Sequence, residues 1–63
     1  SIYLDVADVY SIVAGVRPKL ASANVETIGP VNQPYAQREF MVRAPDGNVL
    51  VFGQALGPDR RSE

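Results

Sequence analysis

The stretch Pro45-Asp46-Gly47-Asn48 separates two apolar runs, residues 37–44 and 49–55, and predicts a β-hairpin. Proline fixes φ at the first turn position, an aspartate side chain accepts a hydrogen bond from the backbone that follows, and glycine adopts positive φ at no steric cost. A type I turn followed by a left-handed glycine suits this spacing. The two runs are therefore expected to be the third and fourth strands of an antiparallel pair.

The hairpin register assigns side chains to the two faces of the sheet. Because side chains alternate along a strand, Val42 would face Leu50 and Phe40 would face Phe52, on the side that packs against a helix. The other side would carry Tyr3, Asp5, Met41, Arg43, Val49, Val51 and Gly53. This set is too apolar to be left in water and too polar for a plain core. A second copy of the chain is the simplest cover for it.

The N-terminal third of the chain predicts a strand followed by a helix. Residues 1–7 alternate with the period of two that is typical of a strand. Asp8 stands where a helix N-cap is expected, and the helix should span about residues 9–22. Its apolar stripe consists of Val9, Ile12, Val13, Val16 and Leu20. Pro18 removes a backbone donor, so a kink or break is expected near Arg17.

The remaining segments complete one α+β module. Residues 24–28 are expected to form a short second strand that ends at Gly29-Pro30, and residues 31–36 a loop. The order is βαβββ, which predicts a mixed four-stranded sheet with one helix on one face. The module covers residues 1–56, and the polar residues 57–63 are expected to form a flexible tail.

Size and composition indicate that the module needs support. A chain of 63 residues buries only about 60% of its unfolded surface. It has no Cys and no His, so disulfides, thiolate metal sites and the commonest general base are excluded. Small domains without these use oligomerisation. We therefore expect a homodimer or a higher homo-oligomer.

Charge and hydropathy give no reason to expect nucleic acid or a membrane as a partner. The chain has 6 basic and 7 acidic residues, for a net charge of −1, and the basic residues form no dense patch. No apolar run approaches the roughly 20 residues that span a bilayer. No signal-peptide pattern opens the sequence, so the expected location is the cytoplasm.

Two stretches together carry a resemblance to a known family. The first is Ser1-Ile-Tyr-Leu-Asp-Val-Ala-Asp-Val9, a strand that runs into an Asp-capped helix. The second, residues 33–54, joins an aromatic-small pair, an Arg-Glu-Phe strand and the Pro-Asp-Gly-Asn hairpin. About residues 1–56 thus resemble a module of the vicinal oxygen chelate superfamily, the group of glyoxalases, bleomycin-resistance proteins and extradiol dioxygenases. Ala44 and Ala36 replace the Asp and Gly that are usual in these motifs.

The resemblance implies that two βαβββ modules pair into a half-open barrel around a cleft. In metal enzymes of the family, ligands lie on the first strand and on the last strand after the hairpin. Those positions fall on Ser1 and Val51, which are not credible metal ligands. The resemblance therefore disfavours a metal enzyme, and we expect no metal, no cofactor and no catalytic residue in this module.

The candidate ligand-binding residues come from the open side of the sheet and its loop: Tyr3, Asp5, Tyr35, Met41, Arg43, Val51 and Gln54. These side chains can line a small-molecule pocket, or they can be solvated or interface residues. Arg38 and Glu39 are adjacent on a strand and point to opposite faces, so we expect structural roles for both.

Three functions remain open from the sequence. The first is metal-independent binding of an unknown small molecule in a cleft between paired modules, as the resemblance to bleomycin-resistance proteins implies. The second is a fragment or half-module of a glyoxalase- or dioxygenase-type metalloenzyme whose ligands are supplied elsewhere. The third is a module that serves assembly alone.

Overall fold

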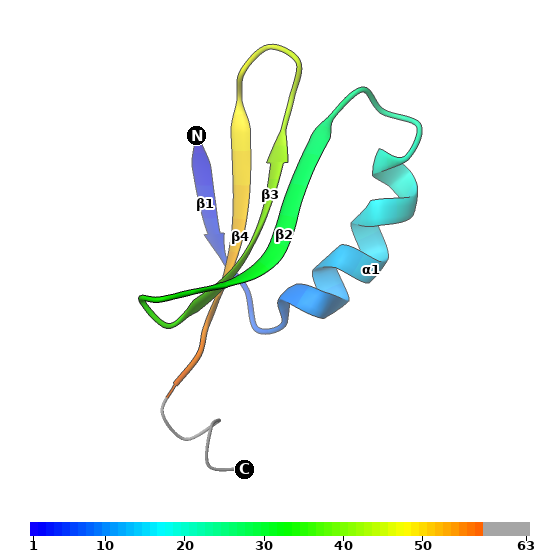
Figure 1. The fold of residues 1–63 in the computed structure, drawn as a ribbon. Helices are drawn as coiled ribbons and strands as arrows, with labels where there is room; N and C mark the ends of the chain where they lie inside the picture. The colour runs from blue at the N-terminus through cyan, green and yellow to red at the C-terminus, as the bar shows by residue number, and fades with distance from the viewer. Residues whose placement is uncertain (58–63) are drawn as a thin grey trace.

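The computed structural model describes residues 1–57, and nearly all of the expected tail lies outside them. In chain order the elements are β1 (Ile2–Asp5), α1 (Val9–Leu20), β2 (Glu26–Gln33), β3 (Gln37–Arg43) and β4 (Val49–Ala55). This order confirms the predicted βαβββ sequence of elements. Figure 1 shows α1 on one side of the sheet and the loop between β2 and β3 reaching past β4 and β1.

The four strands form one mixed sheet in the order β1-β4-β3-β2. β1 runs parallel to β4, whereas β3 is antiparallel to both β4 and β2. The predicted α+β fold, with a mixed four-stranded sheet and one helix, is therefore confirmed. Both β1 and β2 are edge strands, and β1 consists of only four residues.

The hairpin between β3 and β4 has the predicted turn chemistry and register. The Gly47 amide donates to the Ala44 carbonyl at 3.0 Å, and Gly47 has φ 92°. The Asp46 carboxylate accepts from the Asn48 backbone amide at 3.0 Å and from the Asn48 side-chain amide at 2.9 Å. As expected, Phe40 is paired with Phe52 and Val42 with Leu50.

Helix α1 begins at its predicted cap and continues through its proline. The Asp8 carboxylate accepts from the Tyr10 amide at 3.0 Å and from the Ser11 hydroxyl at 2.9 Å. The expected break near Arg17 is wrong, because the helix includes Pro18 and ends at Leu20. Pro18 leaves the Ala14 carbonyl without its usual N–H donor, and only Lys19 and Leu20 follow it in the helix.

The second strand is longer than its sequence predicts. β2 continues through Gly29-Pro30 to Gln33, so the expected strand end and the expected loop start are wrong. Pairing with β3 shifts register between Ile28 and Val31, and Gly29 has φ 101°. A Cβ atom at Gly29 would lie 2.6 Å from the backbone oxygen of Glu39, so this irregularity requires glycine. Such a bulge accommodates a residue without an N–H inside a strand.

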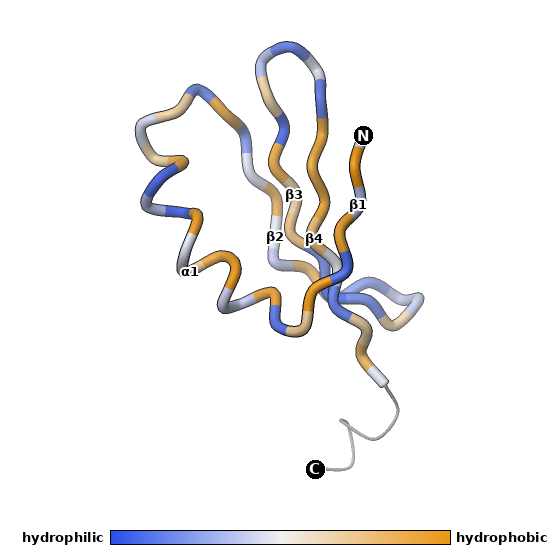
Figure 2. Tube along the Cα trace, turned by 180° about the vertical axis from the view of Figure 1, so that it is seen from behind, coloured by the Kyte–Doolittle hydropathy of each residue, from blue (hydrophilic) through white to orange (hydrophobic). Residues whose placement is uncertain are grey.

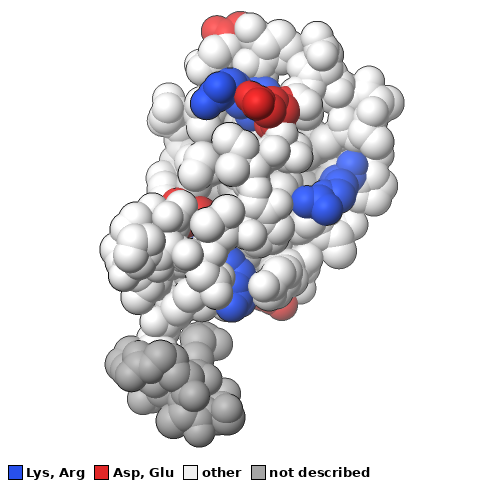
Figure 3. All heavy atoms as spheres, in the orientation of Figure 1, with Lys and Arg blue, Asp and Glu red and all other residues white. Residues whose placement is uncertain are grey.

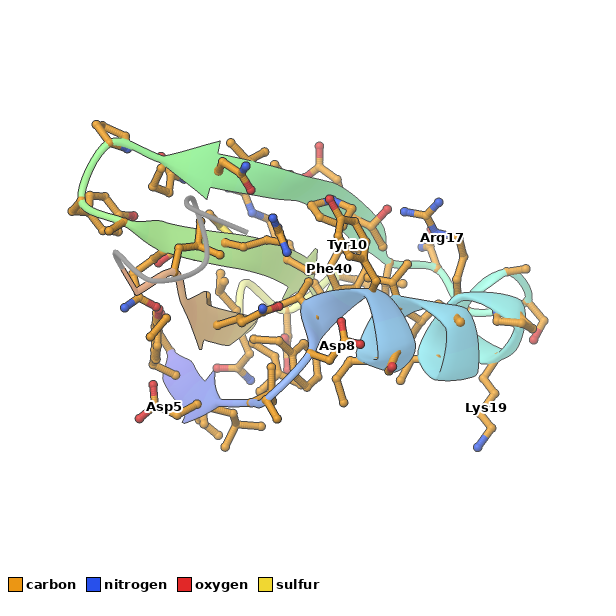
Figure 4. The ribbon with its side chains drawn as sticks, turned by 90° about the horizontal axis from the view of Figure 1, so that it is seen from below. Asp5, Asp8, Tyr10, Arg17, Lys19 and Phe40 are labelled. Atoms are coloured by element: carbon orange, nitrogen blue, oxygen red, sulfur yellow. The ribbon has the colours of Figure 1, made fainter. Side chains whose placement is uncertain are left out.

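The hydrophobic core between α1 and the sheet is small. Among the described residues, the fully buried apolar side chains are Val9 and Phe40, and the Phe40 ring stacks on Phe52 at 6.3 Å. Figure 4 shows Phe40 between the sheet and α1. On the same side of the sheet, α1 does not cover β1. As a result Ile2 is 60% and Leu4 42% exposed. Figure 2 shows the hydrophobic residues of β1 at this edge.

Candidate functional site

The open face of the sheet, opposite α1, holds one nearly buried carboxylate. Glu39 on β3 is 5% exposed, and it points away from the helix because its neighbour Phe40 points toward it. Glu39 Oε1 accepts from the Tyr35 hydroxyl at 2.8 Å and from the Gln33 side-chain amide at 3.3 Å. Glu39 Oε2 accepts from the Tyr3 hydroxyl at 3.0 Å.

The Tyr3 hydroxyl also lies 3.1 Å from Oε1 of Gln37. These five residues, Tyr3, Gln33, Tyr35, Gln37 and Glu39, are called the Glu39 cluster below. They come from three segments: β1, β3 and the end of β2 with its following loop. Gln33, Tyr35, Gln37 and Glu39 all lie within residues 33–39, and the fold adds Tyr3 from β1.

The loop between β2 and β3 brings Tyr35 over the sheet. The Ala36 amide donates to the Gln33 carbonyl at 3.1 Å, and Ala36 adopts φ 62°, the left-handed region that favours glycine. The Ala36 carbonyl accepts from the Leu56 amide at 2.9 Å, which ties the loop to the end of β4. This anchored loop positions the Tyr35 hydroxyl at the Glu39 carboxylate.

Tyr3 reaches the cluster by lying across a glycine. Gly53 on β4 pairs with Asp5 of β1 on one side and with Glu39 of β3 on the other. A Cβ atom at Gly53 would overlap the Tyr3 ring and hydroxyl. The absence of a side chain at Gly53 thus opens the path by which Tyr3 crosses β4 to reach Glu39.

Both tyrosines of the cluster have a raised pKa. Desolvation raises the pKa of Tyr3 most, and the hydrogen bond to Glu39 raises it further. For Tyr35 the hydrogen bond to Glu39 raises the pKa most, followed by desolvation. At neutral pH both hydroxyls therefore stay protonated and act as donors to the carboxylate, not as nucleophiles or bases.

Apolar side chains border the cluster on the same face. Tyr3, Val51, Met41 and Ile28 lie side by side across the four strands. Val31 pairs with Glu39 itself and is exposed. The face combines inward-directed polar groups with an apolar border, a composition that is typical of small-molecule sites.

The structure brings four of the seven predicted site residues together here. Tyr3 and Tyr35 belong to the Glu39 cluster, and Met41 and Val51 form part of its border. Asp5 follows on β1, and its exposed side chain is seen at the outer side of that strand in Figure 4.

Arg43 and Gln54 lie apart from this group. Arg43 forms an exposed ion pair with Glu26 at 3.4 Å, beside a hollow of about 510 Å³ near the β3–β4 hairpin. Gln54 is 6% exposed, and its Oε1 accepts from the Val9 amide at 2.9 Å, so it links β4 to the start of α1. The expectation that Gln54 shares the open side with Tyr3 is therefore wrong.

Sequence reasoning missed Glu39, Gln33 and Gln37 as members of the site. Strand alternation placed Glu39 on the open side, but its expected role was structural, in pairing with other residues or with water. Its burial depends on Tyr3 and Tyr35, which cover it from other segments. The available signal was the count of hydroxyl and amide side chains near one strand end, which includes Gln33, Tyr35 and Gln37.

Within residues 1–57, no three His, Cys, Asp or Glu side chains come close enough to hold a metal ion. The one helix of this part of the chain is too short or too polar to cross a bilayer. Charged side chains are scattered over the face seen in Figure 3, and uncharged atoms cover most of it. No family model matches the chain, and no curated protein matches its sequence.

Proposed function

We propose that the protein binds a small molecule without a metal, in a cleft that forms when two copies pair. The observation that carries this proposal is the Glu39 cluster on the open face of the sheet. Five hydrogen-bonding side chains, Tyr3 and four from residues 33–39, converge there beside the apolar residues Met41, Val51 and Val31. Convergent polar groups within an apolar border are what orient a small ligand.

The exposed apolar surface supports the pairing of copies. Ile2 and Leu4 are exposed at the β1 edge, and Ile28 and Val31 are exposed on the open face. Burying such a side chain contributes about 1.5–3 kcal/mol at most to stability. Because the core is small, the single module gains little free energy from apolar burial. A second copy would cover these residues and close the sides of the cleft.

The sequence resemblance supports the same proposal. A paired βαβββ module of the vicinal oxygen chelate superfamily would form a half-open barrel, and the single-chain fold is compatible with it. Ser1 and Val51 at the two expected ligand positions favour a metal-free member of the bleomycin-resistance kind. The expected cytoplasmic location stays a prediction from the sequence alone.

Light scattering and ligand screening test the proposal. We expect a mass of at least two chains in solution and an increase in melting temperature with some members of a metabolite library. A stable monomer would contradict the pairing. Tight stoichiometric binding of Ni²⁺, Zn²⁺ or Fe²⁺ in calorimetry would favour a metalloenzyme half-module, and an oligomer that no compound stabilises would favour assembly alone.

A further inference from the structure

The Glu39 cluster also specifies the charge of its ligand, an inference that rests on the proposed function. We propose that the cluster binds the protonated amino group of a small organic amine, with the Glu39 carboxylate as the counter-ion and the Tyr3 and Tyr35 rings as the walls. Three features of the cluster support this ligand: the buried charge without a cationic partner, the unused acceptor position, and the placement of the two tyrosines.

Glu39 is a buried acid whose partners are all neutral. Its three hydrogen bonds come from two hydroxyls and one amide. Within residues 1–57, the basic side chain found in an ion pair is Arg43, and its partner is Glu26. Acidic side chains are almost never buried unless they are paired, because neutral donors replace only part of the lost hydration. A cationic ligand would supply the missing charge.

The carboxylate retains room for one more donor. Two carboxylate oxygens offer about four acceptor positions. Tyr35 and Gln33 donate to Oε1, whereas Tyr3 alone donates to Oε2. Oε2 therefore has an acceptor position that no described side chain uses, and we place one N–H of the ammonium group there. Charge-assisted hydrogen bonds of this kind are roughly twice as strong as neutral ones.

The tyrosines present rings to a ligand rather than donors. Both hydroxyls donate to Glu39, and Tyr3 is 49% and Tyr35 61% exposed, so both aromatic side chains are accessible at the cluster. Aromatic ring faces attract cations. An anionic ligand would meet the carboxylate and two electron-rich aromatic rings whose hydroxyls already donate to Glu39. The geometry thus favours ammonium over neutral and anionic groups.

Three probes of one shape test the charge preference on the full chain. Benzylammonium, benzyl alcohol and benzoate are titrated at neutral pH by calorimetry, and backbone amide shifts are followed by NMR. We expect benzylammonium to bind at least about tenfold more tightly than benzyl alcohol, and benzoate not to bind. The amide shifts should be largest in residues 37–41.

Matched variants locate the effect. Glu39→Gln keeps the size of the side chain and removes its charge, so the preference for benzylammonium should disappear. Glu26→Gln removes a carboxylate that pairs with Arg43 outside the cluster, and it should leave the preference unchanged. If Glu39→Gln fails to fold, the wild-type probe series and its NMR shifts still decide the question.

The outcomes separate this inference from the proposed function. If benzyl alcohol or benzoate binds as tightly as benzylammonium, or if Glu39→Gln retains the preference, the ammonium site is wrong while small-molecule binding stands. If none of the three probes binds and no library compound stabilises the protein, both proposals fail. Amide shifts confined to residues outside the cluster would also overturn the ammonium site.

Discussion

The two loops that connect β2, β3 and β4 are built in different ways. The β3–β4 hairpin is held by its own residues, since the Asp46 carboxylate accepts from Asn48 and Gly47 adopts the positive φ. The β2–β3 loop places an alanine, Ala36, at positive φ, and besides its own turn it is held by Leu56 and by Glu39. The β3–β4 turn can therefore be predicted from its own residues. The position of the β2–β3 loop also depends on contacts outside its turn, and these contacts place Tyr35 at the candidate site.

Removing the carboxylate that binds the β2–β3 loop should have the largest effect. Glu39→Ala deletes the acceptor of Tyr3, Tyr35 and Gln33 and empties a nearly buried position, so we expect a loss of about 2–4 kcal/mol in unfolding free energy. Urea denaturation measures it. Glu26→Ala removes an exposed carboxylate and should cost less than about 1 kcal/mol. Equal losses in both variants would contradict the structural role of Glu39.

The hairpin should respond to a change in its own turn. Gly47→Ala forces a side chain to adopt φ 92°, which costs about 1–2 kcal/mol, although no atom lies within 4 Å of the added methyl group. Thermal unfolding measures this change. Gly15→Ala is the matched control, because it also has open space but lies within α1, where alanine should stabilise by about 0.5–1 kcal/mol. A neutral Gly47→Ala would mean that the turn relaxes.

Giving the β2–β3 loop the residue that its backbone favours should have a smaller effect. Ala36→Gly relieves the positive φ of 62° but increases the entropy of the unfolded chain, so the net gain should be about 0.5 kcal/mol. Denaturant midpoints compare the variant with wild type. A clear loss of stability would show that the Ala36 methyl group makes a contact that outweighs the backbone strain.

Alkaline pH should weaken the cluster slightly, because its tyrosines are partly exposed. The folded-state pKa of Tyr3 and of Tyr35 is raised above the ordinary 10.0. Their contribution is therefore fully present below pH 10.0 and is lost as the pH rises through the higher folded values. Melting curves across this range should show less alkaline loss in Tyr3→Phe/Tyr35→Phe than in wild type. An unchanged pH dependence would place the titrating groups elsewhere.

Local patterns in the sequence predict most of the fold. The alternation in residues 1–7, the cap at Asp8 and the hairpin at Pro45 depend on neighbouring residues, and the structure confirms them. The continuation of β2 through Gly29-Pro30 depends on its partner β3, which local breaker signals do not report. Gly29 and Pro30 wrongly predicted a strand end there, because a bulge depends on the pairing of two strands.

The candidate site is less accessible to such reasoning. Tyr3 and Tyr35 were predicted as single side chains, but the carboxylate that joins them was not. Tyr3 meets Glu39 only because β4 lies between their strands and carries a glycine at position 53. That relation depends on strand order and on the absence of a side chain, and neither is visible as a motif.

The position of β1 beside β4 has a consequence for how the chain folds during its synthesis. Ile2 pairs with Leu50, which follows it by most of the length of the described chain. β1 is therefore synthesised before its strand partner β4, and its apolar side chains stay unpaired until β4 is made. Pairings between residues far apart in sequence form slowly, so we expect the sheet to form only after β4 has been synthesised. Chains that stop before residue 49 should stay unfolded and be degraded or bound by chaperones.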